Sequence, residues 1–314
     1  MRCYVGRRVA ALAATLLLVS LLVFVVVRVL PGDPALVILG LEASPESVAR
    51  VRQALGLDQP VAVQYFRWMA RAVHGDLGRS IQYDVPVTSL VLSRLQVTLP
   101  LTLLAGAFMV LGAVPLGVLA ARRHRRAADY VTMVLSQLGV AVPGFWAGLL
   151  LILLFSVRLG WVRAGGFDGW GQGVWPALKS LLLPALALGF FQFAVLARTT
   201  RSAVLEVLRE EYVKTARAKG VAERGVLFHH ALRNAMIPVL TVAGIQIGQL
   251  MAGSIILESV FYLPGLGRLA LGAISARDLP VVQGVVLFVA SVIVMINVAV
   301  DILYGVLDPR IRYE

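Results

Sequence analysis

The sequence predicts an all-α, polytopic membrane protein with six transmembrane helices and both termini in the cytoplasm. Of its 314 residues, 59% are hydrophobic and only 15% are charged, and the mean hydropathy is +0.84. Soluble domains are roughly half apolar, so a soluble fold would expose too much apolar surface. The apolar residues instead gather in six long runs, and about 20 such residues cross the roughly 30 Å hydrocarbon layer as a helix.

These runs divide the chain into a simple order of segments. The predicted spans cover residues 9–30, 98–121, 130–157, 180–197, 236–257 and 281–306. The chain is therefore expected to consist of an N-terminal end with the first span (1–30), an extracytoplasmic segment (31–97), a five-helix core (98–306) that contains a cytoplasmic loop (198–235), and a cytoplasmic tail (307–314).

The distribution of charge sets the orientation. The formal net charge is +12, which could suggest nucleic-acid binding. However, the predicted cytoplasmic segments hold 17 basic and 7 acidic residues, whereas the predicted outer segments hold 11 and 9. Excess Lys and Arg inside is the known orientation rule. We therefore expect membrane lipid and no nucleic acid as a partner. The single cysteine, Cys3, permits no intramolecular disulfide.

The first apolar run is interpreted as an uncleaved span and not as a signal peptide. It is longer than a typical signal core, and no small-residue cleavage pattern follows it. Arg28 near its outer end can snorkel to the interface. At the other side of the second span, the run Arg122–Arg126 is an inside anchor, or else a contact for lipid headgroups.

The outer segment is expected to contain two helices, one starting at Ser44-Pro45 and one near Asp58 and Pro60. In the second helix, apolar residues repeat at helical spacing. This stripe consists of Val61, Tyr65, Trp68, Met69 and Ala72. The pattern suits a helix lying on the membrane surface, and equally suits the core of a small outer cap.

Two further features concern the third span and the loop after it. Val142-Pro143-Gly144 should kink the third span. Residues 158–179 are predicted to form an outer loop whose tryptophans suit an interfacial belt. These are Trp161, Trp170 and Trp175.

A charged island, Glu211 to Pro238, lies between two apolar runs and is the most informative stretch. Tyr212, Ala216 and Lys219 recur at helical spacing and should share one face. Gly220 can end this helix by adopting positive φ. The island therefore predicts a short helix, a glycine turn and a second helix that re-enters the membrane. It would present a compact surface to a cytosolic partner, or be an ordinary amphipathic interface helix.

This island resembles the cytoplasmic loop of ABC-importer permeases, whose pattern is Glu-Ala-Ala, three residues, Gly, then an apolar-Leu-Pro tail. Ala216 and Gly220 match, whereas Lys214 and Thr215 replace the first Glu and Ala, and Arg233 stands where Pro would fall. These departures are similar to the dipeptide/oligopeptide (peptide/nickel) branch. Further sequence motifs typical of that branch occur in the same order over nearly the whole chain: LPGDP, GDLGRS, VPGFW, TARAKG, YLPGLG and DPRIR.

The resemblance implies the fold of a type I ABC-importer permease in the bacterial inner membrane. It further implies a second, homologous permease subunit forming a heterodimer, two ATP-binding subunits inside, and a solute-binding protein outside. ATP and Mg would be bound by the partner ATPases, and this chain would hold no cofactor. The loop residues that would contact the ATPase are Glu211, Tyr212, Thr215, Ala216, Ala218, Gly220 and His230.

Catalytic motifs are not evident in the sequence. No stretch fits the phosphate-binding pattern G-x-x-x-x-G-K-[ST]. All four histidines fall outside the predicted spans, and no helical i, i+4 histidine pair suits zinc. We therefore expect a transport subunit and not an enzyme, with no catalytic residue and no metal site.

Polar residues within spans are costly and therefore informative. Our hypothesis is that uncharged side chains line a polar path for the cargo: Ser136, Gln137, Gln192, Gln246 and Gln249. The alternative is that they form interhelical hydrogen bonds. Asn297 and Asp301 in the last span are expected to have a structural role, and Gly244, Gly248 and Ala252 suit close helix packing.

The predicted function is the membrane pathway of an ATP-driven importer of di- or oligopeptides. Alternatives within the same family are import of nickel chelates or of glutathione. A different class, the ion-coupled secondary carrier, expects ionisable groups at mid-membrane, and the spans offer amides there instead. An intramembrane hydrolase would need a histidine at membrane depth, which the predicted spans lack.

Overall fold

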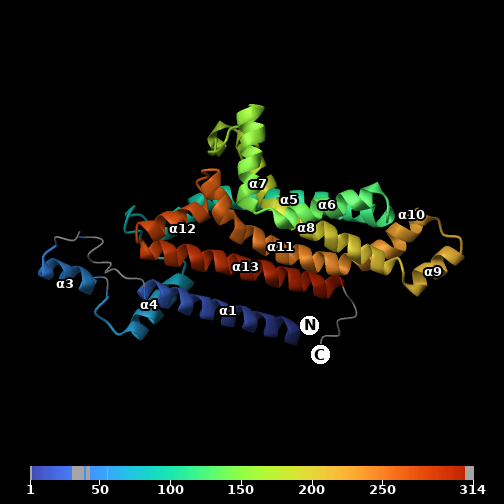
Figure 1. Cartoon of the computed structure of the whole chain (residues 1–314). Helices are drawn as coiled ribbons and strands as arrows, with labels where there is room; N and C mark the ends of the chain where they lie inside the picture. Colours follow the sequence, from blue (N-terminus) through green and yellow to red (C-terminus); the bar gives the residue numbers. More distant parts are fainter. Residues whose placement is uncertain (1, 30–38, 40–42, 55, 308–314) are drawn as a thin grey trace. The chain divides into compact units, whose positions relative to one another are not determined.

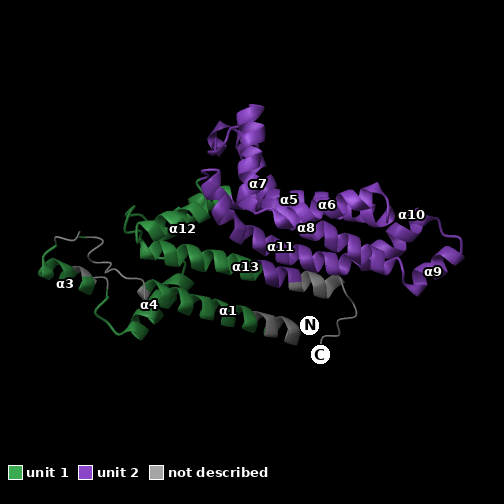
Figure 2. Ribbon diagram, in the orientation of Figure 1, with its two compact units in different colours: residues 1–97, 264–295 green, residues 98–263, 296–314 purple. Residues whose placement is uncertain are grey.

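The computed structural model describes the chain except residues 1, 30–38, 40–42, 55 and 308–314. The described residues form helices and turns, with one isolated β-bridge between Arg79 and Pro86. They divide into two compact units, which are described separately (Figure 2). Unit 1 contains residues 1–97 and 264–295, and unit 2 contains residues 98–263 and 296–314.

Unit 1 is built from α1, the outer segment, α12 and portions of two long helices. Its elements are α1 (Arg2–Val29), α3 (Pro45–Ala54), α4 (Val61–Val73), α12 (Leu266–Ser275), and the unit 1 portions of α5 (Val87–Arg122) and α13 (Leu279–Leu307). The apolar core joins α1, α5, α12 and α13. Val27, Val91, Leu266 and Val285 are among its buried side chains.

Helix α4 packs on α1 through aromatic side chains. The Phe24 ring of α1 lies 5.4 Å from the Tyr65 ring and 6.1 Å from the Trp68 ring, centroid to centroid. Ser20 and Tyr65 share a hydrogen bond of 2.8 Å between their hydroxyls. Of the predicted stripe, Trp68 is buried, but Val61 is exposed. The Tyr65–Trp68 face of this helix therefore packs on α1, and this contact is compatible with both the surface-helix and the cap interpretation.

The hairpin 78–87 of unit 1 is held by one buried carboxylate. Asp278, which is fully buried, accepts a hydrogen bond from the Ser80 hydroxyl and others from the Ile81 and Gln82 amides, at 3.2 and 3.1 Å. The amide of Val281, in the first turn of α13, also points to this carboxylate at 3.4 Å. Asp278 is thus both the N-cap of α13 and the fastener of the hairpin.

Unit 2 is a helical bundle around α8. Its elements are the rest of α5, then α6 (Ala127–Ala141), α7 (Gly144–Leu151), the π-helical η1 (Ile152–Arg158), η2 (Trp170–Gln172), α8 (Val174–Val207), α9 (Glu211–Ala218), α10 (Glu223–Gly225), the π-helical η3 (Val226–Ala231), α11 (Leu232–Val260) and the end of α13. Both α6 and α11 pack against α8. In the most apolar stretch of α8, 61% of the residues are buried.

Small residues allow this close packing. A Cβ added at Gly139 of α6 would come within 2.4 Å of the Ala194 methyl of α8. One added at Gly244 of α11 would lie 2.3 Å from a Val300 methyl of α13. Gly244 is therefore at a tight helix contact, as the spacing of small residues predicted.

The third predicted span is broken and not merely kinked. Helix α6 ends at Ala141, α7 starts at Gly144, and the two pieces meet at an angle of 106°. Val142 and Pro143 have extended backbone, with ψ of 119° and 137°, so the helix stops before them and a new one starts at Gly144. Figure 1 shows α7 leaving the layer of α5, α6, α8 and α11. The expectation of a continuous kinked span was wrong in this respect.

All six apolar runs are helical, but several helices extend past the predicted spans. Five described helices are long and apolar enough to cross a membrane, or six if the bent pair counts as one span. Helix α5 has 36 residues and starts at Val87, well before the predicted start at Thr98. At 1.5 Å per residue it measures about 54 Å, more than the hydrocarbon layer. The side chains of Arg28 and Asp301, and the tail from 308 on, lie outside the described residues.

Candidate functional site

The charged island folds as a compact element between α8 and α11. Helix α9 (Glu211–Ala218) follows the end of α8, a turn leads to α10, and η3 runs into α11. Figure 1 shows α9 and α10 together at one end of α8 and α11. This confirms the predicted order of helix, glycine turn and second helix. The π-helical geometry of η3 was not predicted. Short π-helical segments within α-helices often occur at functional sites.

Gly220 makes the turn that separates the two helical pieces. Its φ is +80°, a left-handed value that favours glycine, and its amide donates to the Arg217 carbonyl at 2.9 Å. No heavy atom lies within 4 Å of the position of an added Cβ. Glycine is therefore required here by backbone conformation and not by lack of space.

The buried face of α9 consists of Val213 and Ala216. Val213 and Ala216 are buried, whereas Tyr212 is 41% exposed and Lys219 is exposed. Tyr212 and Ala216 lie one turn apart on α9, as their spacing predicted, and Lys219 is the C-cap. The residue that is buried together with Ala216 is Val213. Because Val213 points inward, the neighbouring Tyr212 lies at the edge of the element, where it is partly exposed.

Tyr212 nevertheless connects α9 to the start of α11. Its hydroxyl donates to the His230 carbonyl at 3.3 Å and accepts from the Asn234 amide nitrogen at 2.7 Å. Arg217 makes a second connection, donating to Glu223 of α10 at 2.9 Å and to the Leu208 carbonyl at 3.2 Å. These polar contacts tie the three helical pieces together on the surface.

The residues predicted to contact an ATPase mostly lie on the accessible surface of this element. Those exposed are Glu211, Tyr212, Thr215, Ala218, Gly220 and His230, and only Ala216 is buried. Glu211 forms an ion pair with Lys214 at 2.6 Å. Phe228 is 55% exposed on η3, a large apolar side chain that the sequence did not single out.

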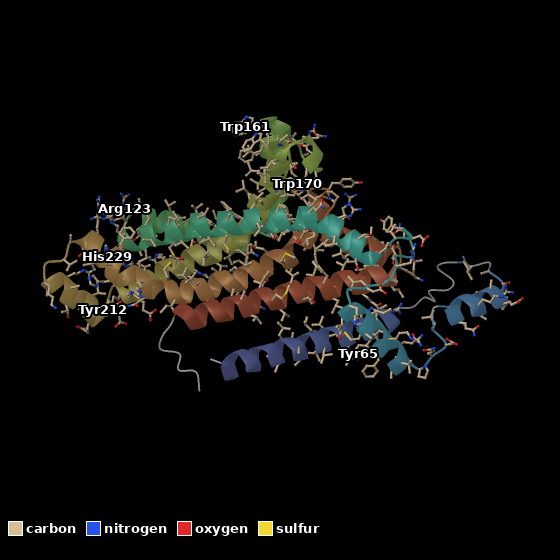
Figure 3. All side chains as sticks on the ribbon, turned by 180° about the vertical axis from the view of Figure 1, so that it is seen from behind. Tyr65, Arg123, Trp161, Trp170, Tyr212 and His229 are labelled. Carbon is tan, nitrogen blue, oxygen red and sulfur yellow. The ribbon has the colours of Figure 1, made fainter. Side chains whose placement is uncertain are left out.

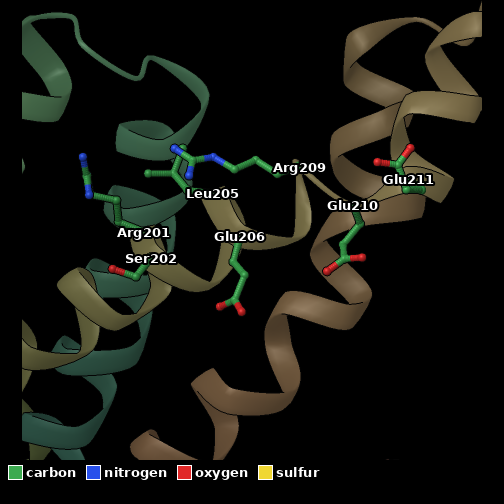
Figure 4. A pocket seen from close by; sticks show the side chains of 7 residues that line it. All are labelled: Arg201, Ser202, Leu205, Glu206, Arg209, Glu210 and Glu211. Atoms are coloured by element: carbon green, nitrogen blue, oxygen red, sulfur yellow. The ribbon is translucent and has the colours of Figure 1, made fainter.

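A groove of about 450 Å³ adjoins this element. It lies along the end of α8 and the start of α9 and is lined by Arg201, Ser202, Leu205, Glu206, Arg209, Glu210 and Glu211 (Figure 4). The lining carries both signs of charge, and the carboxylates of Glu206 and Glu210 point to the same side of the chain in this view. The groove suits a polar side chain from a partner better than an apolar one.

A buried ion cluster fastens the basic run to α8. Asp129, in the first turn of α6, accepts hydrogen bonds from Arg201, from His124 Nδ1 at 2.9 Å and from the Arg125 amide at 2.9 Å. The Asp129 side chain is 4% exposed and Arg201 is 17% exposed. Figure 3 shows Arg123, Tyr212 and His229 at the same end of unit 2. The sequence interpretation of 122–126 as a plain anchor missed this cluster.

The predicted pathway residues separate into two groups. Ser136, Gln192 and Gln246 are buried within unit 2, whereas Gln137 and Gln249 are exposed. Among the described residues, the Ser136 hydroxyl and the side-chain carbonyls of Gln192 and Gln246 have no hydrogen-bond partner. An unsatisfied buried polar group costs about 1–3 kcal/mol. The structure therefore does not display the interhelical hydrogen bonds of the alternative interpretation for these atoms.

Buried carboxylates are the features that sequence reasoning missed. Glu258, in the last turn of α11, is fully buried and accepts from the Thr98 hydroxyl at 2.6 Å. Asp278 holds the hairpin of unit 1 in the same manner. The sequence placed both residues in an outer loop. The position of Asp278 directly before α13 is an N-capping pattern that the sequence offered, although its partner Ser80 was not predictable. Glu258, near the C-terminal end of α11, has no such signal.

Comparison with known proteins identifies the family. Residues 113–313 match the family described as the inner membrane component of binding-protein-dependent transport systems, and residues 1–102 match its N-terminal component. The chain belongs to this family. It is the permease subunit of an ABC importer in the bacterial inner membrane, which confirms the predicted family, all-α fold and location.

Full-length relatives and solved structures agree with this assignment. A peptide transport system permease protein of Brucella abortus (strain 2308) is 48% identical over 314 residues, 100% of both chains. The glutathione transport system permease GsiC of Salmonella paratyphi A is 44% identical over 99% of both. A chain of the inward-facing MetNI methionine ABC transporter superposes with a TM-score of 0.57, at 20% identity, over 70% of this chain and 96% of that one.

Proposed function

We propose that this permease imports small peptides, a class that includes the tripeptide glutathione. The observation that carries the proposal is end-to-end similarity to two kinds of relatives. One kind is named for peptide transport and the other for glutathione transport, at 48% and 44% identity. A nickel chelate remains the alternative cargo.

The family implies ATPase and binding-protein partners. We propose that a second permease subunit completes the pathway, so that the membrane part is a heterodimer. Exposed apolar side chains on α6 and α7 support this, since a partner helix or lipid must cover them. They include Val131, Val134, Phe145 and Trp146.

The coupling element is proposed to be α9, the Gly220 turn, α10 and η3. Support comes from its construction: an exposed surface rests on a small buried face and is tied to α11 through Tyr212 and Asn234. A force applied to α9 therefore reaches a long membrane helix through packed contacts. Bistable packed elements convert such small shifts into larger ones.

The proposed pathway uses the polar side chains of α6, α8 and α11. Gln137 and Gln249 are exposed, and thus available to a solute between the two permease subunits. Ser136, Gln192 and Gln246 have buried atoms without partners. This supports a role in a state in which the helices have moved and these groups meet water or cargo.

The decisive experiment for coupling replaces Gly220 with valine in the complete transporter in proteoliposomes. Valine at φ +80° is strained by about 1–3 kcal/mol. We expect ATP-driven uptake to fall about tenfold or more, since each 1.4 kcal/mol changes an equilibrium tenfold. Membrane insertion and ATP hydrolysis should persist.

Gly75 provides a matched control for this variant. Its φ is +83°, and no heavy atom lies within 4 Å of an added Cβ, yet it lies in the predicted outer segment. Gly75→Val should retain uptake coupled to hydrolysis. Normal uptake by Gly220→Val, or an equal loss in both variants, would contradict the proposed coupling element.

The cargo is tested separately in a deletion strain complemented with this transporter. Uptake of a labelled tripeptide is measured in the presence of unlabelled dipeptide, oligopeptide, glutathione or nickel chelate. Competition by the peptides, and not by the chelate, is the expected result. Competition by the chelate alone would replace peptide by metal cargo.

A further inference from the structure

We propose that a groove in unit 1, lined by Arg94 and Arg268 among others, binds a carboxylate group of the incoming cargo; this inference rests on the proposed function of peptide import. The groove has a volume of about 460 Å³. It is lined by Tyr83, Arg94, Pro264, Gly265, Arg268, Leu269, Leu271, Gly272 and Ser275.

The charge of the groove selects an anion. Arg94 and Arg268 are the charged residues of its lining, and no acidic side chain is among the lining residues. The nearby Asp84 forms an ion pair with Arg79 at 2.9 Å, so its charge is compensated. Guanidinium groups bind carboxylates through paired N–H donors, which adds both strength and geometric specificity.

Arg268 also has a partner within the protein. A guanidinium carries five N–H donors, so this residue can keep its partner and still offer donors to the groove. The internal partner would then hold the side chain in place. Arg94, which is half-buried on α5, supplies the second cation.

The walls of the groove are held in place before any ligand arrives. Tyr83 belongs to the hairpin that buried Asp278 fastens, and the Tyr83 amide donates to the Ser80 hydroxyl at 2.9 Å. On the opposite side, Leu266 and Leu269 anchor α12 in the core of unit 1. A site that is already ordered loses less entropy on binding.

Size and position both favour a small cargo molecule. Ligand pockets generally occupy about 300–1,000 Å³, and this groove is within that range. Its lining residues come from two segments predicted to face outward, 31–97 and 258–280. A cargo released on that side would meet the groove before entering the membrane. Every linear peptide with a free C-terminus, and glutathione, carries at least one carboxylate.

The test measures binding of trialanine by the complete transporter, purified without its solute-binding protein. The complex is placed in nanodiscs of zwitterionic lipid only, so that anionic headgroups do not compete. Equilibrium dialysis compares trialanine with its C-terminal amide. The variants are Arg94→Gln and the conservative Arg94→Lys. Arg71→Gln is the matched control, since Arg71 is exposed on α4 and does not line the groove.

We expect the wild type and Arg71→Gln to prefer the acid to the amide. Arg94→Gln should weaken binding of the acid about tenfold or more, the usual effect of losing a hydrogen bond to a charged group, with little change for the amide. Arg94→Lys should recover part of the difference, because it keeps the charge but not the fork of donors.

Equal affinity of the wild type for acid and amide would overturn the inference, as would unchanged binding by Arg94→Gln. If Arg94→Gln weakens only the capture of the transporter's own solute-binding protein, the groove is a protein-docking surface and the inference is wrong. Failure of peptide import itself would appear differently, as a wild-type transporter that takes up no peptide in the competition assay.

Discussion

Two surface segments of this protein are fastened in opposite ways. The hairpin 78–87 of unit 1 is held by one fully buried carboxylate, Asp278, which accepts from three groups of the hairpin. The coupling element of unit 2 is held by exposed contacts, chiefly those of Tyr212 and Arg217. Burial strengthens polar contacts and raises the penalty for breaking them, so the hairpin should be rigid and the coupling element free to move.

The largest effect on stability is expected at the buried carboxylate of Asp278. Asp278→Ala leaves the Ser80 hydroxyl and the Ile81 and Gln82 amides without their acceptor. We expect a loss of about 3 kcal/mol in the free energy of unfolding. A stranded buried donor costs about 1–3 kcal/mol; the Ser80 hydroxyl is buried, and the Ile81 and Gln82 amides are partly buried. Thermal unfolding of the detergent-purified protein measures the change.

Asp84→Asn is the control for this variant, since Asp84 is on the same hairpin but is exposed and paired with exposed Arg79. Asparagine is used because the φ of residue 84 is +48°, which Asp and Asn tolerate better than alanine. Its midpoint of unfolding should stay close to that of the wild type. If both variants unfold at the same temperature, the contrast between buried and exposed fasteners does not hold.

An intermediate effect is expected at Tyr212. Tyr212→Phe removes the hydrogen bonds to the His230 carbonyl and from Asn234. Each contributes about 1 kcal/mol at most in this exposed setting, so the fold should persist. We expect fewer cargo molecules transported per ATP hydrolysed, because α9 would move without pulling α11.

The ratio of uptake to hydrolysis in proteoliposomes is the measurement, and Tyr130→Phe, at an exposed tyrosine of α6, is the control. An unchanged ratio in Tyr212→Phe would show that the hydrogen bonds of the Tyr212 hydroxyl do not transmit the motion of α9 to α11.

The smallest effect is expected at the exposed ion pair between Arg217 and Glu223, whose side chains are 38% and 70% exposed. Glu223→Gln should lower stability by less than about 1 kcal/mol, and the difference should vanish at high salt. The pair of Arg50 and Glu46 on α3 offers a matched comparison through Glu46→Gln. A large, salt-independent effect at Glu223 would show that the coupling element is as rigid as the hairpin.

Much of the fold could be predicted because helical spans are dictated by local apolar runs. The bilayer leaves a helix as the only way to satisfy the backbone in such a run. The glycine turn at Gly220 was also predictable, since its conformation is local. By contrast, the inward face of α9 depended on whether Val213 or Tyr212 met the rest of unit 2, and spacing alone does not determine that.

The polar contacts between residues far apart in the sequence could not be predicted. Asp129 meets Arg201 and Asp278 meets Ser80 across long separations in sequence. From sequence alone, a charged residue in a loop is expected to be exposed to solvent. Only the tertiary structure shows that it is buried. The break between α6 and α7 was underestimated for a related reason: a proline permits a kink or a stop, and neighbouring packing decides between them.

The ion cluster at Asp129 has a consequence for how often the chain traverses the bilayer. It ties the beginning of α6 to Arg201, near the end of α8. The chain therefore departs from one water-facing side along α6 and returns to the same side along α8. A return trip requires an even number of passages, and α8 is one of them.

The bent pair of α6 and α7 must accordingly be the outward passage, although its two halves meet at 106°. A re-entrant loop would strand the ends of α6 and α8 on opposite sides of the bilayer and pull Asp129 away from Arg201. Counted with the bent pair as one passage, the described helices offer six candidate crossings. The salt bridge between Asp129 and Arg201 favours that count, and it favours placing the loop bearing Trp161 across the bilayer from Asp129.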